Sequence, residues 1–165
     1  MKKLHFISVI LIAVFLAASA FQSSKTKSDN DEISYPDGYR NWTHIKTGFI
    51  GPNNPGFKFS GGFHHIYANN KAMQGYRSGK FPQGSILIFD VINYKETNGN
   101  FDETDRKHLD VMVKDSLKYT TTGGWGFEEF EKDSHTERNL TSIIQIQCAN
   151  CHAQKPDYVF SAFRK

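Results

Sequence analysis

The chain has 165 residues, 20 basic and 17 acidic side chains, and a formal net charge of +3. Lys2 and Lys3 account for most of this excess, because residues 21–165 carry 18 basic against 17 acidic side chains. Proteins that bind nucleic acid or anionic membranes are typically strongly basic. A charge balance so close to neutral therefore argues against both of these classes. The length predicts a single domain.

The N-terminus has the pattern of an export signal. Its two lysines precede an apolar run over residues 4–16, and Ala18-Ser19-Ala20 is a small-residue cleavage pattern. The run is shorter than the roughly 20 residues of a membrane span, so we expect a signal peptide over residues 1–20 in preference to an uncleaved anchor. We therefore expect a periplasmic protein. Residues 21–34 are polar and predict a flexible tether, and residues 35–165 predict one folded domain.

The first half of that domain alternates turns with short regular elements. A turn that leads into a short helix or an extended segment is expected at residues 35–40, and the Gly-, Pro- and Asn-rich residues 48–62 are expected to be rich in loop. Residues 63–67 can form a strand. Residues 69–78 predict a helix, because apolar side chains recur there at helical spacing.

The second half is richer in strands. Residues 85–93 are almost continuously apolar and predict a strand that is buried on both faces, whereas the polar residues 98–105 predict a loop. Residues 107–114 alternate as a half-buried strand does, and residues 122–130 predict a turn followed by a strand. A helix that presents the two cysteines is expected over residues 142–149. The fold class that follows is α+β, mainly antiparallel sheet with a few short helices and a C-terminal helix that carries the cysteines.

The two cysteines of the chain lie in one segment, Cys148-Ala149-Asn150-Cys151-His152. Two thiols one helical turn apart can each bond a vinyl group on one edge of a haem, and the following histidine then ligates the iron. A disulfide or a zinc site is the alternative, but a zinc site normally needs further Cys or His ligands at close spacing. We therefore expect one covalent haem c, bound by Cys148, Cys151 and His152, with His152 as the metal ligand.

The C-terminal position of this motif bears on the sixth iron ligand. No methionine follows His152, as one would in a typical small electron carrier, so we expect an open and largely apolar distal face. Other side chains remain candidates for a sixth ligand: Met73, Met112, His44, His64, His65, His108 and His135.

Several segments give the chain a family resemblance. They are Tyr35-Pro36-Asp37-Gly38-Tyr39-Arg40-Asn41-Trp42, Ile66-Tyr67-Ala68-Asn69, Gly79-Lys80-Phe81-Pro82-Gln83-Gly84, Val111-Met112-Val113-Lys114-Asp115, Thr122-Gly123-Gly124-Trp125-Gly126-Phe127-Glu128 and Asp157-Tyr158-Val159-Phe160. Their order before a C-terminal haem motif resembles the cytochrome P-460 family, which includes the cytochromes c′-β. The resemblance implies an antiparallel β fold, often a homodimer, with a five-coordinate haem.

The same resemblance implies two possible chemistries. Members that oxidise hydroxylamine carry a lysine bonded to the haem edge, and an ungapped comparison puts Phe89 at that position. Lys95 lies six residues further along, roughly 20 Å away in a strand. This departure favours the cytochrome c′-β side, where phenylalanines line the distal pocket and nitric oxide or carbon monoxide binds. Phe63 and Phe89 are the expected distal pair.

Three functions follow as hypotheses. The first is a haem protein that binds nitric oxide or a similar small gaseous or amine ligand. The second is an oxidoreductase acting on hydroxylamine, and the third is an electron carrier with a redox partner protein. Arg40 and Arg106 are candidate partners of the haem propionates.

Overall fold

The computed structural model describes residues 32–164, and the residues from Ile33 onward form one compact unit. The expected signal peptide and most of the expected tether lie outside the described residues. Ile33, which we assigned to the tether, is only 8% exposed and packs with Tyr39 in the core. Within the described residues, no helix has the length and apolar character needed to span a bilayer.

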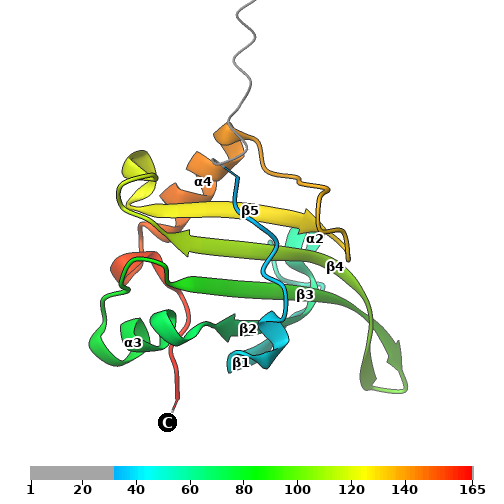
Figure 1. Ribbon diagram of the computed structural model, residues 1–165. Helices are drawn as coiled ribbons and strands as arrows, with labels where there is room; N and C mark the ends of the chain where they lie inside the picture. The colour runs from blue at the N-terminus through cyan, green and yellow to red at the C-terminus, as the bar shows by residue number, and fades with distance from the viewer. Residues whose placement is uncertain (1–31, 165) are drawn as a thin grey trace, which may run out of the picture. The chain divides into compact units, whose positions relative to one another are not determined.

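The unit is built on one antiparallel sheet of five strands in which each strand pairs with the next one in the chain (Figure 1). The strands are β1 (Thr43–Ile50), β2 (Gly62–Ala68), β3 (Ile86–Thr97), β4 (Asn100–Lys114) and β5 (Trp125–Glu131). The α+β class is confirmed. The strands expected at residues 63–67, 85–93 and 107–114 correspond to β2, β3 and the second half of β4.

Short helices connect the strands and end the chain. They are α2 (Phe57–Ser60), α3 (Asn70–Ser78) and α4 (Ser142–His152), with 3-10 turns at Tyr39–Asn41, Thr120–Thr122 and Pro156–Tyr158. The Asn69 side chain caps α3 by accepting a 2.8 Å hydrogen bond from the Ala72 amide. Thr141 caps α4 in the same way. Both caps satisfy amides that the first helical turn leaves unpaired.

One sequence expectation is wrong, and a second holds only for part of its segment. Residues 98–105 do not form a loop, because β3 and β4 continue as a long exposed hairpin whose turn is only Asn98 and Gly99. Both turn residues have positive φ, at 55° and 82°, as a tight hairpin turn requires. Residues 48–62 are also not all loop, since they contain the end of β1 and the whole of α2.

Both faces of the sheet are covered. The cavity face, which bears Leu87 and Phe89 of β3, packs against Ala149 of α4 and other apolar residues. The N-terminal face, which bears Ile88 and Asp90, packs against Ile33. Figure 1 shows the N-terminal segment crossing one face of the sheet, with α2 and α4 on the other. This explains why β3 is apolar at nearly every position.

A buried ion network holds the N-terminal face. Asp90 is completely buried, and its carboxylate accepts hydrogen bonds from Arg106 Nε at 2.7 Å, the Tyr39 hydroxyl at 2.5 Å and Arg40 Nη2 at 3.0 Å. Arg106 also pairs with Asp133. Burial alone raises the pKa of Asp90, but the hydrogen bonds from Arg106 and Tyr39 outweigh it and hold the pKa below its ordinary value.

Replacing this carboxylate tests its role. We expect Asp90→Asn to lower the free energy of unfolding by about 3 kcal/mol at neutral pH, because it removes the buried counter-charge of Arg106 and leaves only the exposed Asp133 as its partner. Since the folded-state pKa is depressed, this contribution is present above the unfolded pKa of about 3.9 and is lost as the pH falls through the folded pKa. Denaturant titrations between pH 3 and 7 would measure it.

The matched control is Asp102→Asn, which removes an exposed carboxylate of β4. This variant should stay within about 0.5 kcal/mol of the parent protein. Equal stability of the two variants at neutral pH would contradict a structural role for Asp90.

Candidate haem site

A cavity of about 740 Å³ opens on the cavity face of the sheet. Its walls come from α2, β3, β4, β5, α4 and the C-terminal segment, and Cys148, Cys151 and His152 all contribute to them. The volume lies within the roughly 300–1,000 Å³ that is usual for cofactor sites. The structure therefore brings the three residues of the expected haem motif together at one cavity.

The two cysteines are presented by the last turns of α4. They are three residues apart on the helix, which places them on the same side, and both are free thiols. Burial raises the pKa of the Cys148 thiol, and the nearby carboxyl groups of Asp110 and Glu129 act in the same direction. Two unpaired thiols at a largely apolar cavity fit thioether attachment of a haem.

His152 is oriented for ligation. Its Nδ1 lies 2.8 Å from the backbone carbonyl oxygen of Tyr158, so Nδ1 carries the proton and Nε2 keeps its lone pair. Burial lowers the pKa of His152 more than this hydrogen bond raises it, which favours the neutral imidazole that binds a metal. The rings of Phe127 and Phe160 lie edge-on to the imidazole, with centroids 5.2 Å and 4.8 Å away.

A strained turn sets the position of the Tyr158 carbonyl. Asp157 and Tyr158 both have positive φ, at 44° and 65°, which non-glycine residues seldom adopt. Three bonds anchor Asp157: its carboxylate accepts from Lys114 Nζ at 2.7 Å and from the Phe81 amide at 2.6 Å, and its carbonyl accepts from Trp125 Nε1 at 3.0 Å. These bonds connect the sheet to the residue that orients His152.

Three neighbouring strands of the sheet contribute one apolar and two acidic side chains to the cavity wall. Strand register aligns Phe89 of β3 with Asp110 of β4 and Asp110 with Glu129 of β5, and all three line the cavity. Burial raises the pKa of Asp110 well above its ordinary value, and the neighbouring Glu129 raises it further. His64 of β2 stacks on the Phe89 ring, with centroids 4.7 Å apart. The wall facing the haem motif is thus apolar at Phe89 and acidic beside it.

Three of the site residues expected from the sequence lie elsewhere. Phe63 pairs with Ile92, so its side chain points to the N-terminal face, where it contacts Phe49. The structure does not bring it together with Phe89. Arg40 and Arg106 are bonded to Asp90 on that same face and do not line the cavity.

The candidate sixth ligands are also dispersed. Met112 lines the cavity, whereas Met73 is a residue of α3 that is buried in the core. His44 and His65 share the Thr47 hydroxyl on β1 at 3.0 Å and 2.8 Å. His135 stacks on Tyr35, with ring centroids 3.7 Å apart. His64 of β2 and His108 of β4 lie on the cavity face, next to the row formed by Phe89, Asp110 and Glu129.

Sequence reasoning missed three cavity residues, Phe59, Asp110 and Glu129. The alternation of β4 placed Asp110 on one face with Met112, which was the available signal. Pairing with β5 was needed to bring Glu129 beside it. Phe59 lies in the region expected to be loop, and no periodic pattern distinguishes it.

Comparison with protein families identifies a match. The family model described as Cytochrome P460 matches residues 36–161, which is well over half of the chain. A search of the curated proteins finds no match.

Replacing Asp157 tests whether the turn at this residue orients His152. We expect Asp157→Ala to release the Tyr158 carbonyl and so weaken its hydrogen bond to His152, which makes the imidazole a poorer donor to iron. The iron–histidine stretching frequency should fall, and the reduction potential should rise by up to roughly 59 mV, which is a tenfold change for a one-electron couple. Resonance Raman spectroscopy and potentiometry measure these quantities.

Asp102→Ala, at the exposed hairpin, is the control and should change neither quantity. An unchanged stretching frequency in a folded Asp157→Ala protein would show that the turn keeps its shape without the carboxylate.

Proposed function

This chain belongs to the cytochrome P460 family, and from that premise we propose that it is an exported cytochrome c whose single covalent haem binds nitric oxide or a similar small ligand. The family supports a c-type haem cytochrome. The haem is attached at Cys148 and Cys151, with His152 as its protein ligand. It supplies an iron with an open position for a diatomic molecule.

Phe89 is the observation that carries this proposal. It lines the cavity at the position where hydroxylamine-oxidising relatives are expected to have a lysine, and no lysine is among the described residues that form the cavity wall. Lys80 and Lys95 are both exposed. A chain without a lysine at the haem edge fits the cytochrome c′-β side of the family.

The residues around the cavity support binding of a small, weakly polar molecule. Phe59, Phe89 and Met112 give the wall apolar surface, which excludes water and bulky or charged molecules. Nitric oxide needs little hydrogen bonding to bind, so an apolar wall favours it over ligands that depend on polar contacts. The carbonyl of Tyr158 holds the imidazole of His152 in place. The imidazole therefore does not need to move when a ligand enters on the other side of the haem.

The alternative function is oxidation of hydroxylamine. Asp110 and Glu129 favour it, because two carboxyl groups at the cavity wall can take up the protons that leave an amine substrate. Burial and the neighbouring Glu129 raise the pKa of Asp110, which favours its protonated form beside the site. A homodimer and a redox partner protein, both suggested by the family, remain predictions, as does export.

Absorption spectroscopy of the purified, haem-loaded protein separates these functions. We expect a high-spin five-coordinate ferrous spectrum that changes on addition of nitric oxide. A low-spin ferrous spectrum would instead indicate a sixth protein ligand and an electron carrier. Intact mass and peptide mapping should show one haem and two thioether bonds. A third bond to a lysine, or turnover of hydroxylamine, would favour the enzyme.

A pair of phenylalanine variants tests the cavity wall. Phe89→Ala should raise the association rate of carbon monoxide with the ferrous protein by about tenfold, or roughly 1.4 kcal/mol in barrier, because it opens the space where the ligand enters. Phe63→Ala removes the same ring from the opposite face and should change the rate by less than about twofold. Stopped-flow spectroscopy measures both rates, and equal effects of the two substitutions would exclude Phe89 from the ligand's path.

A further inference from the structure

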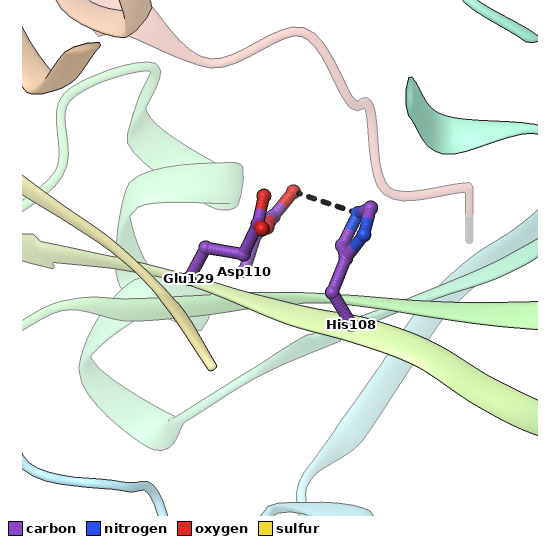
Figure 2. A group of neighbouring side chains, drawn as sticks. All are labelled: His108, Asp110 and Glu129. Atoms are coloured by element: carbon purple, nitrogen blue, oxygen red, sulfur yellow. Dashed lines mark ion pairs between the residues drawn. The ribbon is translucent and has the colours of Figure 1, made fainter. Parts of the chain in front are cut away.

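Three metal-ligating side chains converge beside the haem cavity. His108 and Asp110 are two residues apart on β4 and point to the same face, and Glu129 on β5 pairs directly with Asp110. Figure 2 shows the three side chains directed toward one another. One ligand atom from each lies within 4.8 Å of the others, and His108 Nε2 is 3.7 Å from Asp110 Oδ2.

The cluster contains polar atoms without partners. His108 is only 7% exposed, and its Nε2, directed at Asp110, has no hydrogen-bond partner among the described residues. Oδ1 of Asp110 is a second buried atom without a hydrogen-bond partner in the described part of the chain. A buried polar atom left unsatisfied costs about 1–3 kcal/mol, so a group that binds these atoms would stabilise the cluster.

We propose that His108, Asp110 and Glu129 bind one divalent first-row transition-metal ion, separate from the haem iron. One imidazole nitrogen and two carboxylate oxygens form a ligand set that suits zinc, manganese or ferrous iron. A cation at this point also balances two adjacent carboxylates that otherwise repel each other. This ion would be a second metal in the protein, in addition to the iron of the single haem in the proposed function.

The surroundings of the cluster support metal binding. Ligand–metal distances of about 2.0–2.2 Å require the three ligand atoms, which lie within 4.8 Å of one another, to approach more closely when an ion binds. Oε1 of Glu129 accepts a 2.8 Å hydrogen bond from Asn139 Nδ2, an outer contact of the kind that orients carboxylate ligands. Asp110 and Glu129 also line the haem cavity, so the remaining metal positions face the space where small ligands enter.

Titration calorimetry of the chelator-treated, haem-loaded protein with zinc chloride tests the proposal. We expect one saturable site, and each of His108→Gln, Asp110→Asn and Glu129→Gln should weaken zinc binding by at least about tenfold. Asp102→Asn removes an exposed carboxylate from the same strand and should leave the affinity unchanged. His65→Gln, which removes a surface imidazole next to His44, should also leave it unchanged.

Two further measurements keep the outcome clear. The haem absorption spectrum and the thermal unfolding midpoint of each variant separate a lost metal site from a lost fold or a lost haem. Anomalous diffraction at the zinc edge should give a peak between the three side chains. Absence of saturable binding, or affinity unchanged in all three variants, would overturn the proposal and leave a carboxyl pair that shares a proton. Neither result depends on whether nitric oxide binds the haem.

Discussion

A β-bulge in β4 decides which polar side chains reach the haem cavity. Val91 of β3 pairs with His108, but the next residue, Ile92, pairs with Arg106, so β4 contains one extra residue at this point. In a regular strand, residues 106, 108 and 110 would share one face. The bulge turns Arg106 to the N-terminal face and leaves His108 and Asp110 on the cavity face. Because both faces are covered, neither group can turn toward solvent without disrupting a packed layer.

The two aspartates on either side of the sheet show what this separation achieves. Asp90 is neutralised by Arg40 and Arg106, and its pKa is lowered. Asp110 instead lies beside a second carboxyl group and a histidine, and burial together with the neighbouring Glu129 raises its pKa. The first arrangement stabilises the fold. The second places a carboxyl group with a raised pKa at the wall of the cavity, a pattern that is often found at functional sites.

The sequence was informative where local chemistry determines the structure. The spacing of Cys148, Cys151 and His152 needs only a helix to form its site, and α4 supplies it. The apolar run at residues 85–93 fixes a buried strand whatever its partners are. The polar hairpin was missed because its side chains face solvent on both sides and leave no period to detect. Phe63 and Arg106 were misplaced for a different reason, since their faces depend on strand register and on a bulge that no residue pattern marks.

One strand connects all parts of the site. At its C-terminal end, Lys114 of β4 anchors Asp157 and thereby the carbonyl that orients His152. Four residues earlier in the same strand, Asp110 forms part of the cavity wall. Met112, which lies between Asp110 and Lys114 in the strand, also lines the cavity. The distance from the proximal anchor to the acidic wall is therefore fixed by the rise of a single strand, about 3.4 Å per residue. A shift of β4 that moves Asp110 therefore also moves Lys114, the residue that supports the proposed iron ligand through Asp157.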